Sequence, residues 1–158
     1  MKRIIGIIFL LALSTYGYAA PDEKPAAKPI AELNLWHILK SKFSTSRDGD
    51  KGLIIDDESG RRVLKSTDDR RKQVIFTCPW VAKHPIPANL RMEQIGLWNR
   101  DNKKFQVVYD SVSKIFMLQW RVPFQQAMTS EEAVAQMEDF FLAVNSFYKQ
   151  FHESGLLE

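Results

Sequence analysis

A broad apolar stripe near the C-terminus constrains the fold of this chain more than any other feature. The stripe recurs at the three- and four-residue spacing of one helix face, and it consists of Val134, Met137, Phe140, Phe141, Val144, Phe147, Tyr148 and Phe151. Thr129 precedes Glu132 by three residues, which is the capping-box spacing, and Gly155 follows where a helix should end. Such a helix is stable only when its stripe is buried. The sequence therefore predicts a long C-terminal helix packed on another layer.

The rest of the pattern supplies that layer. Apolar and β-branched residues at 53–55 and 63–64 flank the turn signal at 58–60, and a third strand is predicted at 74–78, with Pro79 expected to end it. Residues 105–110 and 115–120 alternate as an antiparallel hairpin. Polar segments at 44–51 and 68–72 are predicted as breaks between strands.

Two further helices complete the order of elements. Apolar residues recur helically from Ile30 to Phe43, and residues 88–98 contain good helix formers. Strands joined by short turns must pair antiparallel, because parallel neighbours need a long crossover. The predicted class is α+β, with about five strands in the order α-β-β-β-α-β-β-α.

The N-terminus has the pattern of a secretory signal peptide. Lys2 and Arg3 precede an apolar run over residues 4–13 that Gly6 alone interrupts, and small residues lead to an expected cleavage after Ala19. The run is too short to span a hydrocarbon layer of about 30 Å, so no stable membrane anchor is predicted. We therefore expect a signal peptide over 1–19, a linker over 20–29, a domain over 30–155, and a periplasmic or secreted protein.

Charge argues against nucleic acid as a partner. The formal net charge is +3 for the whole chain and becomes +1 when residues 1–19 are removed, because Lys2 and Arg3 leave with them. The basic runs at 61–62 and 70–72 have Asp68 and Asp69 between them, so no uncancelled basic stripe is available to phosphates.

Catalytic and metal-binding groups are sparse. Cys78, the one cysteine, lies six positions before His84, the only arrangement that resembles a nucleophile and its base, and no third orienting residue is evident. Asp48, Gly49 and Asp50 begin like a calcium loop, but Gly52 occupies a ligand position. The acidic run at 56–58 is typical of a hairpin tip. We therefore predict no catalytic residue, no metal ligand and no cofactor, with Cys78 as a buried strand residue.

Two aromatic segments are candidates for contact with a partner. Aromatic and proline side chains anchor protein interfaces when they are exposed. The candidate residues are Trp80, Pro85 and Ile86 in and after the third strand, and Trp120 and Phe124 at the end of the last strand.

Several of these segments together resemble the YbjN-domain family. The resemblance rests on Trp98-Asn99-Arg100, on the strand that ends at Tyr109-Asp110, on the hairpin after it, and on the capping box before a Phe-rich helix. It implies a fold similar to type III secretion chaperones, with a twisted antiparallel sheet flanked by helices, and a role as a bacterial sensory transduction regulator. The family's Asp-x-x-Gly turn is replaced here by residues 110–114, and the export signal is a second departure.

The motif residues Trp98, Asn99, Tyr109 and Asp110 are interpreted as structural. We expect the Trp98 ring to be buried under the sheet, and Asn99 to end its helix, since Asn tolerates the left-handed conformation.

The function predicted from these observations is an exported, non-enzymatic binding module that acts through a protein or peptide partner, as a chaperone or a regulator. Two alternatives stay open. One is a periplasmic carrier of a small ligand, which needs a dry pocket between the sheet and the long helix. The other is a thiol enzyme using Cys78 and His84. Exposed strand edges could also pair two copies, so a homodimer is open too.

Overall fold

The computed structural model describes residues 26–48, 51–56, 58–83 and 85–157. Within these residues, six strands form one antiparallel sheet in the order β2-β3-β4-β5-β7-β6. They are β2 (Ser44–Asp48), β3 (Lys51–Ile55), β4 (Arg62–Asp68), β5 (Gln73–Val81), β6 (Phe105–Asp110) and β7 (Ile115–Pro123). The predicted α+β class and the broad order of elements are confirmed, and this sheet has one strand more than the five expected.

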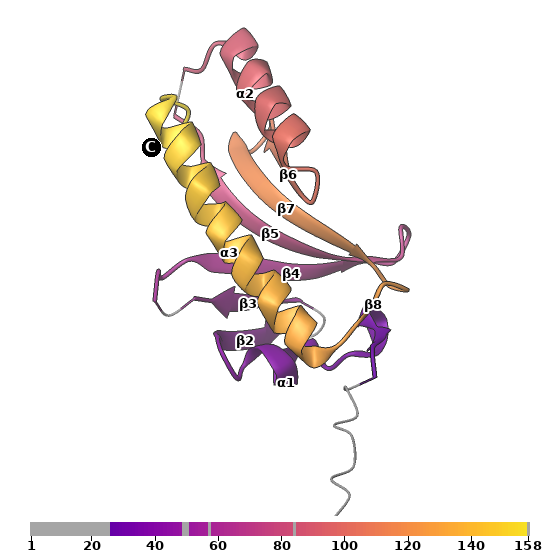
Figure 1. Cartoon of the computed structure of the whole chain (residues 1–158). Coiled ribbons are helices and arrows are strands. Elements are labelled where there is room, and N and C mark those ends of the chain that lie inside the picture. The colour runs from indigo at the N-terminus through magenta and orange to yellow at the C-terminus, as the bar shows by residue number, and fades with distance from the viewer. Residues whose placement is uncertain (1–25, 49–50, 57, 84, 158) are drawn as a thin grey trace, which may run out of the picture.

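The three α-helices lie at different places along the sheet (Figure 1). The long helix α3 (Ser130–Glu153) crosses the sheet, α1 (Leu35–Leu39) lies near β2, and α2 (Ala88–Asp101) packs beside β6 at the other end. In the part of the chain that the structure describes, no helix is both long and apolar enough to span a membrane.

The ends of α3 follow the prediction. The Thr129 hydroxyl accepts a hydrogen bond from the Glu132 N–H at 3.1 Å, and the Glu132 carboxylate accepts one from the Thr129 N–H at 2.7 Å. Gly155 has a φ of +71°, and the Leu156 N–H donates to the Phe151 carbonyl at 2.9 Å. This is the Schellman ending that a glycine permits, because its missing Cβ removes the penalty for positive φ.

The core lies between α3 and one face of the sheet. Strand residues alternate, so one set of side chains from β3, β4, β5, β7 and β6 points to α3 and is buried. Phe140, Phe147 and Phe151 of α3 are fully buried against this face. The centroid of the Phe140 ring lies 5.2 Å from that of Phe105, and the centroid of the Phe151 ring lies 5.3 Å from that of Phe116.

Two strand predictions were wrong. Residues 44–48, expected as a polar break, form β2 at the sheet edge, where a short polar strand can face solvent. Pro79, expected to end its strand, lies inside β5, which continues to Val81. The ladder between β4 and β5 ends at Thr77, whereas the ladder between β5 and β7 runs on to Val81. Pro79 therefore lies where one flank of β5 has no paired strand, the position at which a sheet tolerates proline.

The first predicted helix divides into two pieces. The 3-10 helix η1 (Ile30–Glu32) ends at Leu33, which is extended, and α1 begins after Asn34. The Asn34 side chain accepts a hydrogen bond from the His37 N–H at 3.3 Å, so asparagine caps a new helix rather than continuing the old one.

The chain enters the domain through a second, two-stranded sheet. Strand β1 (Lys28–Pro29) pairs with β8 (Ala127–Met128), and the Ile30 N–H donates to the Gln126 carbonyl at 2.9 Å. The last two residues of the predicted linker therefore belong to a strand. The predicted signal peptide lies outside the described residues.

Candidate functional site

The five residues predicted to contact a partner do not form one surface. Trp120 is 4% exposed and lies in the inner row of β7, where its ring stacks on Phe76 with centroids 4.8 Å apart. That part of the prediction was wrong, because the alternation of β7 directs Trp120 into the core. Phe124 is half-buried against the core, below the N-terminal segment.

The other candidates lie around the end of β5. Trp80 is half-buried, with its ring 4.8 Å from that of Phe147. Ile86 packs partly against the core, and Pro85 is exposed. Pro85 and Pro87 are exposed, and the described residues of this loop include no aromatic side chain that could anchor a partner.

The Trp98-Asn99 pair joins α2 to the edge strand β6. Trp98 is 3% exposed, and its indole N–H donates to the Phe105 carbonyl at 2.8 Å. The Asn99 amide bonds both backbone groups of Val107: its Nδ2 donates to the carbonyl at 3.0 Å, and its Oδ1 accepts from the N–H at 2.6 Å. The side chain thus imitates a neighbouring strand and closes that edge of the sheet.

The prediction that Asn99 ends its helix was wrong. Helix α2 continues to Asp101, and the capping residue is Asn102, whose N–H and side chain both donate to the Trp98 carbonyl, at 2.8 Å and 3.1 Å. The prediction considered only the local conformation of Asn. The amide is instead used for a tertiary contact with β6.

Tyr109 and Asp110 make contacts at the end of β6. The Tyr109 ring lies 4.9 Å from that of Phe116, and the Arg91 guanidinium lies 4.4 Å from its centroid. The Asp110 carboxylate accepts hydrogen bonds from the Val112 N–H at 2.9 Å and from the Ser113 hydroxyl. The Ser113 hydrogen bond, with that of Val112, lowers the pKa of Asp110 below its ordinary value. These bonds build the turn between β6 and β7.

Cys78 is a core residue on β5. Its side chain is 4% exposed, and the thiol lies 3.1 Å from the Arg62 carbonyl. Burial raises the pKa of Cys78 from its ordinary value of 9.0 to about 12, although the nearby Arg61 opposes the shift. A thiol that stays protonated is a poor nucleophile, so the geometry does not support a thiol enzyme. His84 lies outside the described residues.

The raised pKa of Cys78 predicts a pH dependence of stability. A buried neutral thiol stabilises the fold fully below the unfolded pKa near 9, and this contribution falls as pH rises toward 12. We expect iodoacetamide to alkylate the native protein at pH 8 far more slowly than the urea-unfolded protein. Between pH 9 and 11, the Cys78→Ala variant should lose less stability than the wild type in denaturant titrations. Equal alkylation of the native and unfolded proteins would contradict the burial.

Metal ligation has no assembled candidate in the described part of the chain, where no three His, Cys, Asp or Glu side chains meet. Gly49, Asp50 and Asp57, which belong to the acidic runs weighed from the sequence, lie outside the described residues.

The face of the sheet turned away from α3 is the most unusual surface of the molecule. The strand registers bring the alternate side chains of five strands together there. Besides Pro79 and Pro123, eight of them are large aliphatic or methionine side chains, and none of these eight belongs to the buried core or packs against it. We call this set the open face; it consists of Leu53, Ile55, Leu64, Ile75, Val81, Val108, Ile115 and Met117.

The open face is large and partly exposed. Leu64 is 47% exposed and Val81 is 60% exposed, and the other members are half-buried. Strands lie about 4.8 Å apart and side chains on one face recur about every 6.8 Å, so the set spans roughly 20 Å in each direction. Polar side chains lie among them, because the registers place Ser66, Thr77 and Gln119 on the same face. Exposed apolar side chains gathered on one face are typical of a surface that contacts a partner.

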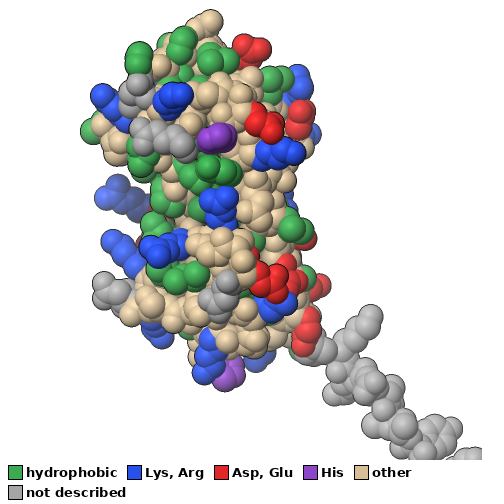
Figure 2. All heavy atoms as spheres, turned by 90° about the vertical axis from the view of Figure 1, so that its left-hand side faces the viewer, with side chains coloured by type: hydrophobic (Ala, Val, Ile, Leu, Met, Phe, Trp, Pro, Cys, Tyr) green, Lys and Arg blue, Asp and Glu red, His purple; other side chains and the backbone are tan. Residues whose placement is uncertain are grey.

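Basic residues border the open face. Lys51, Arg62 and Arg121 extend from the same face of β3, β4 and β7, and all three are exposed. Helix α3, on the opposite side, carries acidic residues at 131, 132, 138, 139 and 153. Figure 2 shows this separation, with basic side chains mostly along one side of the molecule and acidic ones along the other.

Sequence reasoning did not find the open face, although a signal was present. Residues 53–55, 63–64 and 74–76 are apolar at consecutive positions. A strand covered on one side should alternate apolar and polar residues, so consecutive apolar residues indicate that both faces are apolar.

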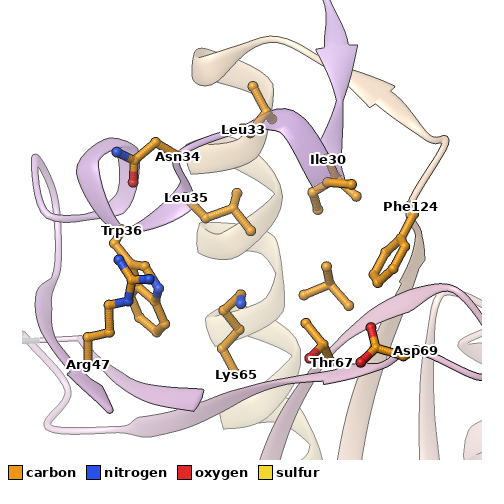
Figure 3. A pocket seen from close by; sticks show the side chains of 12 residues that line it. Ile30, Leu33, Asn34, Leu35, Trp36, Arg47, Lys65, Thr67, Asp69 and Phe124 are labelled. Carbon is orange, nitrogen blue, oxygen red and sulfur yellow. The ribbon is translucent and has the colours of Figure 1, made fainter. Parts of the chain in front are cut away.

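A pocket lies on the inner face, between the N-terminal segment and the sheet (Figure 3). Its volume is about 460 Å³. Ile30, Leu35 and Phe124 form apolar walls, and Lys65 of β4 points into the space from below, next to Trp36. We call it the Lys65 pocket. It lies at the edge of the core, below η1 and α1, and not under α3, where the carrier alternative had placed a pocket.

Comparison with known proteins finds solved structures of similar fold but no matching family. No family model matches the sequence, and no curated protein matches it. Among solved structures, a chain of the HopA1-SchA chaperone-effector complex is similar, with a TM-score of 0.50 and 14% identity, covering 65% of this chain and 78% of that chain. The two chains share a fold.

A second similar structure is a chain of the ExsC-ExsE complex, with a TM-score of 0.49 and 17% identity, covering 66% of this chain and 78% of that chain. Identities this low concern the fold alone. The resemblance to the YbjN-domain family stays a prediction.

Proposed function

We propose that this protein binds a segment of another polypeptide on its open face, as an exported, non-enzymatic chaperone or regulator. The observation that carries the proposal is the set of eight apolar side chains on a sheet face that no described helix covers. Apolar surface of this size is stabilised when a partner removes it from water.

The charged residues around the open face indicate the chemistry of the partner. The described carboxylates on the same face are engaged at strand ends, Asp68 with the Arg71 N–H at 3.1 Å and Asp110 within its turn. Lys51, Arg62 and Arg121 therefore dominate the rim. A segment that combines apolar residues with flanking acidic residues would fit this face, since complementary charges steer association and fix register.

Two further lines of support are independent of this surface. The HopA1-SchA structure, whose fold is similar, is a complex of a chaperone with an effector. The pattern of residues 1–19 supports export to the periplasm or beyond, where the partner would be met.

The test compares two exposed leucines on opposite sides of the molecule. A photo-crosslinking amino acid is placed at Leu64 on the open face or at Leu142 on α3, which is 67% exposed. We expect a polypeptide adduct from the Leu64 position and none from the Leu142 position. For the captured partner, the double variant Leu64→Ser, Val81→Ser should bind about ten-fold or more weakly, whereas Leu142→Ser should bind like the wild type.

Stability measurements separate binding from folding. Each serine replaces an exposed side chain, so we expect the double variant to unfold at nearly the wild-type denaturant concentration. Equal adducts at both positions, or full binding by the double variant, would contradict the proposal. An adduct made only of two copies of this chain would replace it with self-association.

A further inference from the structure

Arg62 differs from the other basic residues that border the open face, because members of that face lie on both sides of it. Its neighbour Val63 is fully buried in the core, so the alternation of β4 turns Arg62 to the open face. Across the ladder with β3, Arg62 pairs with Ile55, and Leu64 follows it on the same face of β4. The neighbours of this exposed arginine on β3 and β4 are therefore apolar.

Arg62 also lies between the two most exposed members of the open face. The ladder between β4 and β5 ends at Leu64 and Thr77. Continued by one step, this register places Arg62 next to Pro79, and Val81 is the next residue on that face of β5. From the usual spacing of a sheet, the Cα of Arg62 lies about 7 Å from that of Leu64 and about 8 Å from that of Val81. Leu64 is 47% exposed and Val81 is 60% exposed, so a partner that covers both must pass over Arg62.

One end of this row is hollowed. Leu64 borders a hollow of about 470 Å³, whose lining includes Leu53 and the hydroxyl residues Ser46, Ser66 and Thr77. The hydroxyl side chains are short, so they leave room beside the two leucines. A hollow with this lining suits a large apolar side chain.

The guanidinium of Arg62 is placed to bind a carboxylate of a partner. Among the described residues, no ion pair includes Arg62, and its recorded hydrogen bond uses the backbone carbonyl. The Arg121 guanidinium, by contrast, donates to the Gln119 side chain at 3.1 Å and 2.6 Å. A guanidinium binds a carboxylate through two parallel hydrogen bonds, while the stem of an arginine can lie on apolar surface.

We propose that Arg62 selects partner segments in which an acidic residue lies between two apolar residues at alternate positions. In an extended segment, side chains two positions apart lie about 7 Å apart on the same side, which matches the steps from Leu64 to Arg62 and from Arg62 to Val81. The first apolar side chain enters the hollow, the carboxylate accepts hydrogen bonds from Arg62, and the second apolar side chain covers Val81. This inference rests on the proposed function and specifies the partner of the open face.

The experiment uses phage that display random peptides of about ten residues, which are longer than the face when extended. Peptides that bind the purified wild-type protein but not its Leu64→Ser, Val81→Ser variant are sequenced. Between the two apolar positions, we expect Asp and Glu to be enriched about five-fold or more over the starting library.

Reversal of the charge assigns this preference to Arg62. The same selection on Arg62→Glu should enrich Lys and Arg at the central position instead. Arg121→Glu makes the same charge change on the same face of β7, outside the row, and should keep the acidic preference. Arg62 and Arg121 are both exposed, so we expect both variants to unfold at nearly the wild-type denaturant concentration.

A binding measurement on one selected peptide gives the size of the effect. Its match carries glutamine in place of the central glutamate, and fluorescence anisotropy measures both. The wild type should bind the acidic peptide about five-fold or more tightly than the match, as a charge-assisted contact at a partly solvated site does. Arg62→Gln should bind the two peptides equally.

Two results would overturn the role of Arg62 and leave the open face as a binding surface. They are selected peptides with no acidic preference, and an unchanged preference in Arg62→Glu. A selection that yields no peptide dependent on Leu64 and Val81 would also overturn it. The photo-crosslinking experiment at Leu64 then decides separately whether the proposed function fails.

Discussion

Replacing Trp98 with alanine should lower the free energy of unfolding by about 3–5 kcal/mol, as deletion of a large buried aromatic side chain does. The indole is 3% exposed and meets two phenylalanines of α3 edge to face, Phe147 at 5.5 Å and Phe151 at 6.4 Å. It also satisfies the Phe105 carbonyl. The substitution opens a cavity where α2, α3 and β6 meet. Denaturant unfolding followed by circular dichroism measures the loss.

Two further variants serve to interpret the loss of stability in Trp98→Ala: one separates the packing of the ring from its hydrogen bond, and the other is a surface control. Trp98→Phe keeps most of the ring packing but loses the N–H donor, so it should cost about 1–3 kcal/mol. Met92→Ala, on the same helix at a side chain that is 64% exposed, should change stability by less than about 0.5 kcal/mol. An unchanged melting temperature for Trp98→Ala would show that the ring is not part of the core.

Replacing Asn99 with alanine should cost about 2–4 kcal/mol, because it leaves both the N–H and the carbonyl of Val107 without their partner. An unsatisfied backbone group that is partly buried loses water on folding and regains nothing. The effect is therefore larger than that of an ordinary surface asparagine. It would also reopen the edge of β6 to pairing with another strand.

Hydrogen exchange tests the contact made by Asn99 directly. The Val107 amide should be protected in the wild type and should exchange much faster in Asn99→Ala, while the exposed control Arg100→Ala leaves it protected. Asn99→Asp keeps an acceptor for the Val107 N–H but sets a carboxylate against the Val107 carbonyl, so it should also destabilise. Equal protection of Val107 in all variants would contradict the bidentate contact.

The candidate sites differ in how far the sequence could reveal them. Cys78 was predicted to be buried because it follows β-branched and aromatic residues, and it is. Trp120 was misassigned because an aromatic residue near a strand end can face either side, and only the register with Phe76 decides which. The open face could have been inferred from consecutive apolar residues, but its size could not, since its members come from five strands.

The Lys65 pocket could not have been predicted. Lys65 reads as one more basic residue in a charged stretch, and its burial depends on Trp36, which lies 29 positions earlier in the sequence. Gly52 gave no signal either, because the ring that needs its missing Cβ comes from another element.

The sequence alone determined the periodic features of this protein: the stripe of α3, its capping box and terminal glycine, the two hairpins and the α+β class. These depend on residues close together in the chain, where spacing fixes which side chains share a face. The tertiary structure alone decided which face of the sheet stays uncovered, that Asn99 bonds a strand instead of ending a helix, and that Lys65 lies beside Trp36. Those outcomes follow from strand register and helix placement, which join distant residues and have no local pattern.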